Sequence, residues 1–163
     1  MNRTRVFLIG ALCLIASTAS AQHRDPLLQM LEGTWKGTVD AGGVTRPCEV
    51  VYAFALDAAF LEGTQKVYKD ASKRVVLSEE RIYLKSAAES DIAVNTFASS
   101  GVSRWGTWTG AAKSWTGELQ GSDGSRVALA IEFADGTHMV RTGTLFDADG
   151  ALAEVVTVRL EKR

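Results

Sequence analysis

Apolar and polar residues alternate along most of the chain after residue 33. The apolar residues fall at every second position between residues 50 and 56, and again between residues 127 and 133. Because successive side chains of a strand point to opposite sides, both segments predict strands with one buried face. Turn-forming Gly, Asp and Ser residues separate such segments. The expected strands are residues 33–40, 47–56, 60–69, 74–85, 91–99, 103–109, 114–120, 126–134, 138–146 and 152–162.

A short helical segment precedes the first expected strand. Asp25 can cap the free backbone N–H groups of residues 26–31, and Pro26 suits the first helical position. Leu27, Leu28 and Leu31 would share one face of this helix. A helix of this length is not stable alone, so we expect its apolar face to pack on the sheet.

The short turns predict that consecutive strands pair in sequence order. A meander of about ten antiparallel strands removes its exposed edges by closing into a barrel. We therefore predict an all-β fold, an antiparallel up-and-down β-barrel with a short N-terminal helix. Two stacked sheets are the alternative.

The first 21 residues have the pattern of a secretory signal peptide. Arg3 and Arg5 supply the positive start, residues 6–16 the apolar core, and Ala19-Ser20-Ala21 the small residues of a cleavage site. The apolar core is shorter than the roughly 20 residues that span a bilayer. We expect residues 22–163 to form a single exported domain, periplasmic or secreted.

Composition narrows the range of functions. The chain has 18 basic and 19 acidic residues. Loss of Arg3 and Arg5 with the signal peptide would leave 16 and 19, a net charge of −3. No basic patch indicates nucleic-acid binding. Cys48 is the only cysteine after residue 21, so the predicted mature chain cannot form an internal disulfide.

The segment Gly33-Thr34-Trp35-Lys36-Gly37, after a short helix and before a β meander, resembles the opening of calycins. This group contains lipocalins and fatty-acid-binding proteins. The resemblance implies that Trp35 closes one end of the barrel and that a basic residue of the last strand, here Arg159, packs over it. It also implies an interior cavity for a small, largely apolar or fatty-acid-like molecule. The resemblance is to small secreted bacterial proteins of uncharacterised families.

Arg81 and Tyr83 would share one face of a strand. A guanidinium and a phenol can together hold a carboxylate, and fatty-acid-binding proteins use an Arg-x-Tyr pair for this purpose near their C-terminal end. The alternative, which we favour, is an exposed strand on which Glu79 and Glu80 pair with Arg81.

Four further residues complete the expected ligand-binding set. Arg141 lies on an otherwise uncharged strand, so it is either solvent-facing or a polar anchor inside a cavity. Tyr52 and Phe54 alternate with their neighbours and would line the core or the cavity. We add Trp105, from the tryptophan-rich segment 103–117.

The sequence contains no complete catalytic or metal-binding pattern, and we expect neither an enzyme nor a cofactor. His138 could in principle bind haem iron, but it follows a turn and is expected to be exposed. The segment 147–150 resembles the start of a calcium loop yet lacks the rest of the pattern, which favours a hairpin turn. Cys48 is expected to be a buried, unreactive thiol.

Two functions from different classes remain. The first is a barrel that binds or carries a small apolar molecule in its interior. The second is a cell-envelope module that recognises another protein through Trp105, Trp108 and Trp115, because aromatic side chains are enriched in interfaces. A cavity inside the barrel favours the first, and burial of these tryptophans weakens the second.

Overall fold

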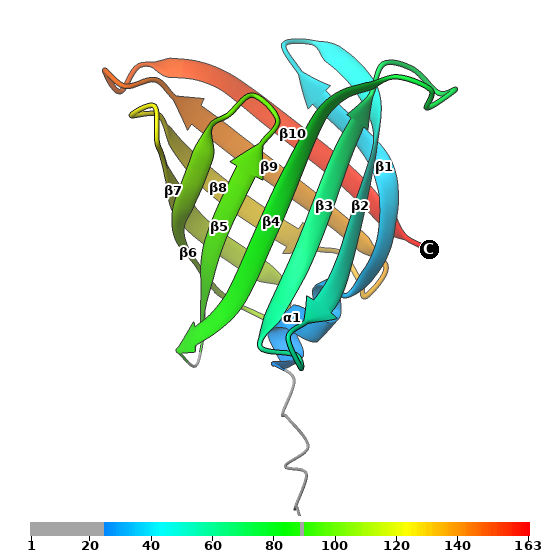
Figure 1. The fold of residues 1–163 in the computed structure, drawn as a ribbon, viewed down its shortest axis with the longest axis vertical. Helices are drawn as coiled ribbons and strands as arrows, with labels where there is room; N and C mark the ends of the chain where they lie inside the picture. The colour runs from blue at the N-terminus through cyan, green and yellow to red at the C-terminus, as the bar shows by residue number, and fades with distance from the viewer. Residues whose placement is uncertain (1–24, 89) are drawn as a thin grey trace, which may run out of the picture.

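The computed structural model describes residues 25–88 and 90–163. Its elements are α1 (Pro26–Leu31), β1 (Gly33–Ala41), β2 (Val44–Ala55), β3 (Phe60–Tyr68), β4 (Val76–Ala88), β5 (Asp91–Ala98), β6 (Ser103–Ala111), β7 (Ser114–Gly121), β8 (Arg126–Phe133), β9 (His138–Phe146) and β10 (Leu152–Lys162). All neighbouring strands pair antiparallel, and β1 pairs with β10 to close a ten-stranded barrel (Figure 1). The predicted fold class is confirmed, and the alternative of two stacked sheets is wrong.

The clearest difference from the expected boundaries is at the start of β2. The sequence predicts a strand that begins at Pro47. The strand begins instead at Val44, since Gly42 and Gly43 both adopt positive φ angles (54° and 76°) and form a two-residue hairpin. Turns with two positive φ angles match the twist of paired strands, so pairing starts directly after the turn.

One end of the barrel is covered by α1, as Figure 1 shows. The Asp25 carboxylate accepts a hydrogen bond from the Leu27 N–H at 2.8 Å, and Pro26 occupies the first turn, as the sequence predicts. Leu28 and Leu31 are buried. We call this end the closed end. The β1–β2 hairpin, coloured cyan, lies at the opposite end, which we call the open end.

The barrel core follows the alternation of the sequence. Inward-facing residues of neighbouring strands, such as Leu61 and Leu84, are register partners and are fully buried. Glycine allows close contact between the first and last strands. A Cβ added to Gly37 would overlap the backbone carbonyl of Arg159 on β10, so β1 and β10 approach closely there. Glycines at defined positions help a sheet curve into a closed barrel.

Candidate functional site

The closed end is built around Trp35, which has no exposed surface. Its indole N–H donates a 2.7 Å hydrogen bond to the Leu31 carbonyl, so β1 holds the last turn of α1. The Lys162 ammonium lies 5.3 Å from the centre of the Trp35 ring and also donates to the Met30 carbonyl at 3.2 Å. These contacts join β1, α1 and β10. They place Trp35 at the closed end of the barrel, between α1 and β10.

The predicted partner of Trp35 was wrong. Arg159 points outward and forms an ion pair with Asp40 on the outer surface. The reason is the strand alternation, because Val158 and Leu160 face the interior and therefore Arg159 cannot. The same alternation places Lys162 on the inner face. Counting in steps of two from Leu160 would have selected Lys162 from the sequence.

Aromatic rings extend the packing away from Trp35. Phe133 makes edge-on contacts with Trp35 and Trp115, at centroid distances of 6.5 Å and 5.3 Å. Trp108 then lies 6.2 Å from Trp115. Trp35, Trp108 and Trp115 are at most 3% exposed. We call these four rings the floor of the barrel interior. Aromatic contacts of this kind bury large apolar areas.

Beyond this floor the barrel is hollow. A cavity of about 310 Å³ reaches from Trp108 toward the open end. Its mouth includes Arg104, at the start of β6, and Leu145, near the end of β9. Apolar side chains of β7 to β10 form much of its wall: Leu119, Val127, Leu129, Leu145, Val156 and Val158.

Arg141 is the most deeply placed cation of this cavity and is 8% exposed. Its guanidinium donates to the Tyr52 hydroxyl at 3.3 Å and to the Gln65 side-chain oxygen. The structure therefore places Arg141 and Tyr52 together inside the barrel. Both of these partners are neutral groups. A buried guanidinium normally has a charged partner or several hydrogen bonds, so Arg141 retains capacity for an acceptor from a ligand.

Burial raises the pKa values of two groups near Arg141. The pKa of the Tyr52 hydroxyl is raised by burial, and the charge of Arg141 opposes this change. Burial raises the pKa of the Cys48 thiol to about 11. Cys48 is 1% exposed, so it is the buried thiol that the sequence predicts, protonated and poorly nucleophilic at neutral pH.

Three cavity-lining donors have no hydrogen-bond partner among the described residues. They are the Thr96 hydroxyl, Nε of Arg104 and the indole Nε1 of Trp108. Trp108 was expected at a protein interface, and Thr96 and Arg104 were not among the expected site residues. Thr96 continues the alternation of Ile92 and Val94, so its inward direction was predictable. Its proximity to Arg104 depended on the pairing of β5 with β6.

Arg81 and Tyr83 do not contribute to the cavity. Ile82 and Leu84 face inward, which directs Arg81 and Tyr83 to the outer surface. There Glu62 accepts a 3.3 Å hydrogen bond from the Tyr83 hydroxyl and lies 3.6 Å from the Arg81 guanidinium. The favoured alternative of an exposed strand is correct, although the carboxylate comes from β3 rather than from Glu79 or Glu80.

The remaining aromatic candidates divide between the two faces of the sheet. Phe54 is half-buried and packs against the core without lining the cavity. Trp105 is 48% exposed on the outer surface, so its assignment to the interior ligand site was wrong. Trp108 and Trp115 are buried inside the barrel. The structure thus removes two of the three tryptophans on which the protein-interface hypothesis depended.

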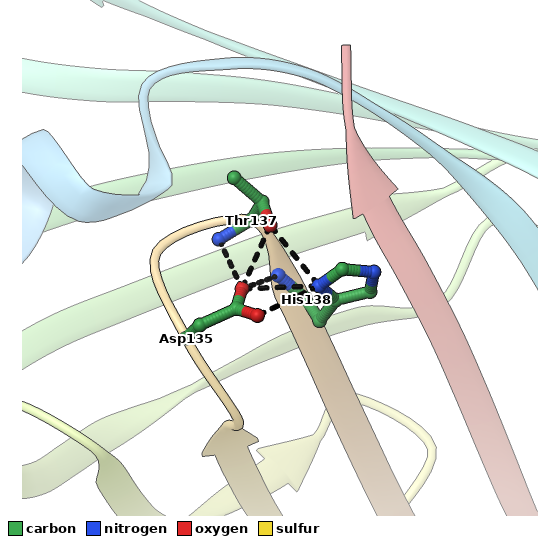
Figure 2. Close-up of polar contacts among 3 residues, drawn as sticks. All are labelled: Asp135, Thr137 and His138. Carbon is green, nitrogen blue, oxygen red and sulfur yellow. Dashed lines mark hydrogen bonds and ion pairs between the residues drawn. The ribbon is translucent and has the colours of Figure 1, made fainter.

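His138 lies at the β8–β9 turn, outside the barrel and exposed, as the sequence predicts (Figure 2). The Asp135 carboxylate accepts hydrogen bonds from the Thr137 hydroxyl and backbone N–H, both at 2.7 Å, and lies 3.0 Å from His138 Nδ1. These bonds, led by that of the Thr137 hydroxyl, hold the pKa of Asp135 well below its usual value. This position gives His138 no access to the cavity, which excludes it as an interior haem ligand.

Other polar clusters are also turns. Asp147 accepts backbone hydrogen bonds from Asp149 at 3.0 Å and Ala151 at 2.9 Å, which confirms a hairpin turn. Within residues 25–88 and 90–163, no group of three or more His, Cys, Asp or Glu side chains could hold a metal ion. No helix of this same part of the chain is long and apolar enough to cross a membrane. The predicted signal peptide lies outside the described residues.

Comparison with known proteins supports the fold. Rv2717c from M. tuberculosis superposes with a TM-score of 0.64 at 19% identity, over 85% of this chain and 98% of that chain. The S-type phycobiliprotein lyase CPES from Guillardia theta has a TM-score of 0.61 at 11% identity, over 83% and 89%. No family model and no curated sequence matches the chain. The structural neighbours support the fold, a closed antiparallel β-barrel.

Proposed function

We propose that this protein binds a small, largely apolar molecule inside the barrel. The observation that carries the proposal is the cavity of about 310 Å³, which lies above the aromatic floor and opens away from α1. A barrel whose only task was structural could fill its interior with side chains, as small barrels commonly do. Of the solved barrels compared, CPES is described as a phycobiliprotein lyase.

The cavity volume sets the size of the ligand. An apolar cavity of about 150 Å³ holds benzene in a well-studied engineered protein. Ligand pockets generally begin near 300 Å³. A cavity of 310 Å³ therefore suits two fused rings or a short branched chain. A fatty acid would fit if its tail extended out through the open end.

Arg141 supplies the polar anchor in this proposal. Its guanidinium lies deep in the cavity with the Tyr52 hydroxyl and the Gln65 amide as partners. A carboxylate or carbonyl oxygen of the ligand would accept a hydrogen bond there in a low-dielectric setting, where such bonds are strong. The apolar remainder of the ligand would contact β8 to β10.

The first test is native mass spectrometry of the protein purified from its own host. A persistent added mass that disappears on denaturation would support a carrier and would give the mass of its ligand. The second test uses naphthalene as a defined probe, with binding followed by NMR. Absence of both a retained molecule and naphthalene binding would contradict the proposal.

Gly143 offers a position from which a new side chain would enter the cavity. A Cβ at this position would meet Val127 at 3.6 Å and Leu129 at 3.9 Å, which are ordinary contacts. We expect Gly143→Leu to abolish naphthalene binding, and Val156→Phe on the neighbouring strand to do the same. Ala53→Leu, on the exposed face of β2, is the matched control and should bind as the wild type does. Binding that survives both filling variants would place the probe elsewhere.

The proposed function also includes export of the protein and binding of the ligand without chemical conversion. We infer that residues 1–21 are removed during export, so N-terminal sequencing of protein from the envelope fraction should begin at Gln22. Detection of the intact N-terminus in the cytoplasm alone would contradict export. A molecule recovered from the protein should also remain chemically unchanged on prolonged incubation, since we propose binding without catalysis.

A further inference from the structure

Unpaired hydrogen-bond donors gather on one wall of the cavity. The Thr96 hydroxyl, Arg104 Nε and Trp108 Nε1 are buried, face the cavity and have no partner among the described residues. Thr96 belongs to β5, and the other two belong to β6. Thr96 and Trp108 are each only 3% exposed. All three groups can donate a hydrogen bond.

The strand register explains why these donors lie together. Thr96 and Arg104 are direct partners across β5 and β6, so their side chains project to the same side. Arg104 and Trp108 are four residues apart on one strand and share its inner face, with Gly106 between them. Gly106 carries no side chain, and β7 approaches closely at this position, where a Cβ would overlap the Glu118 backbone carbonyl.

The opposite wall has a different character. Besides Arg141 and Glu154, it consists of Gly143 and apolar side chains from β8, β9 and β10: Val127, Leu129, Leu145, Val156 and Val158. The cavity therefore has three unpaired donors on the β5–β6 wall and mainly hydrocarbon on the β8–β10 wall. A ligand that matched both walls would carry its oxygens along one edge.

Leaving these donors unpaired is energetically costly. A buried donor without an acceptor costs about 1–3 kcal/mol, and most buried polar groups in native proteins are paired. Trp115 Nε1 is also unpaired, but this residue does not line the cavity. Trp115 therefore provides an internal reference for an unpaired indole that a cavity ligand cannot reach.

The charges around Arg104 indicate that the acceptor need not be an anion. Glu80 and Glu154 line the same cavity. The pKa of Asp123 is lowered by hydrogen bonds from Ser125 and, to a smaller degree, by the charge of Arg104. Since acidic side chains already share the cavity with this guanidinium and Asp123 lies within reach of its charge, a neutral carbonyl oxygen is a sufficient partner for its free N–H.

We propose that the ligand is a flat, ring-containing molecule with at least two oxygen acceptors along one edge and an apolar opposite edge. The oxygens accept hydrogen bonds from Thr96, Arg104 and Trp108, and the apolar edge packs against β8 to β10. Lactones, fused-ring ketones and related carbonyl compounds form this class. The inference rests on the proposed function and narrows it to a ligand class.

The test compares coumarin with naphthalene. Both are flat two-ring molecules, but coumarin carries a ring oxygen and a carbonyl oxygen on one edge. Coumarin loses more hydration on entering an apolar site, so a cavity without free donors would favour naphthalene. We expect the full-length mature protein to bind coumarin at least as tightly as naphthalene, with dissociation constants measured by NMR titration.

Two variants remove one donor each: Thr96→Val nearly keeps the side-chain shape, whereas Trp108→Phe also removes ring volume, which Trp115→Phe controls for. Thr96→Val and Trp108→Phe should each weaken coumarin binding about fivefold relative to naphthalene, the effect of one hydrogen bond. The matched controls are Thr107→Val, on the exposed face of β6, and Trp115→Phe. Both controls should leave the ratio of the two dissociation constants unchanged.

The indole N–H resonances give an independent readout without mutation. Coumarin should move the Trp108 N–H proton to higher frequency, as hydrogen bonding does, and naphthalene should not. The Trp115 N–H proton should respond equally to both probes. These signals also report directly that each protein sample is folded.

The possible outcomes separate the two proposals. Naphthalene binding tighter than coumarin binding, with a ratio unchanged in Thr96→Val and Trp108→Phe, would overturn the acceptor-edge inference while the binding function stands. In that case water is the partner of the donors. Failure of both probes to bind would instead contradict the proposed function, and the inference with it.

Discussion

The two ends of the barrel differ in whether their buried hydrogen-bond donors have partners. At the closed end, the Trp35 indole N–H donates to the Leu31 carbonyl, and Lys162 lies against the Trp35 ring. In the hollow half, Trp108 and Thr96 are nearly as buried, yet their donors have no partner among the described residues. The comparison teaches that a tryptophan is structural where its hydrogen bond is satisfied and is a candidate ligand contact where its donor is unpaired and also faces the cavity.

The largest expected effect is a difference in the free energy of unfolding between a variant in the closed end and a variant in the cavity wall. Trp35→Ala removes a fully buried ring from the closed end and should lower the free energy of unfolding by about 3–5 kcal/mol. Leu129→Ala, on the half-buried cavity wall, should cost about 1 kcal/mol because this side chain already borders open space. Urea denaturation measures both values. Equal losses would show that the cavity wall is packed as tightly as the floor.

Alanine substitutions of Gly37 and Gly143 test whether a Cβ atom at each position meets the backbone of a neighbouring strand or enters the cavity. Gly37→Ala forces β1 away from the Arg159 carbonyl and should cost about 1–3 kcal/mol through overpacking. Gly143→Ala points into the cavity and should leave stability unchanged or raise it by up to about 1 kcal/mol. Thermal and urea unfolding of the two variants give this comparison. A destabilised Gly143→Ala protein would mean that the cavity is smaller than described.

Substitutions of Lys162 and Arg159, two cations of β10, test which of them stabilises the closed end. Lys162→Met should lower the free energy of unfolding by about 1 kcal/mol, because the ammonium lies against Trp35 and donates to the Met30 carbonyl. Arg159→Met should change it by less than about 0.5 kcal/mol, because the ion pair with Asp40 is exposed. A larger loss of stability for Arg159→Met than for Lys162→Met would instead favour Arg159, the residue expected from the calycin resemblance, as the residue that stabilises the closed end.

The smallest expected effect concerns the Asp135 turn at the closed end. Hydrogen bonds from Thr137 and His138 hold the pKa of Asp135 below its unfolded value, so the unfolded state binds more protons in acid. This contribution is fully present above about pH 4, the unfolded pKa of an aspartate, and is lost as pH falls further. Asp135→Asn should therefore make the fall in stability below that pH shallower.

The control for this prediction is Asp149→Asn, another exposed turn aspartate, which removes the same charge without the Thr137 and His138 contacts. Unfolding midpoints measured from pH 7 down to pH 2 compare the three proteins. An Asp135→Asn curve parallel to the wild type would show that the turn does not contribute to acid sensitivity.

The alternation of apolar and polar residues, with the turn residues between segments, was enough to predict about ten strands and their antiparallel order. Capping residues predicted the short helix, and the turn residues before His138 predicted its hairpin position. The role expected for Trp35 came from the resemblance to calycins. The alternation also contained the partner of Trp35, since Lys162 shares the inner face with Leu160. The error at Arg159 arose from following a family resemblance over the alternation.

Only the tertiary structure decided which inward-facing residues share a site. Alternation directs Tyr52, Gln65 and Arg141 to the interior, but these residues are far apart in sequence and meet because ten strands close into a ring. Likewise, Thr96 and Arg104 become neighbours through the β5–β6 register. A period of two determines the face on which a side chain lies, whereas barrel closure and side-chain volumes determine its neighbours and the space left between them.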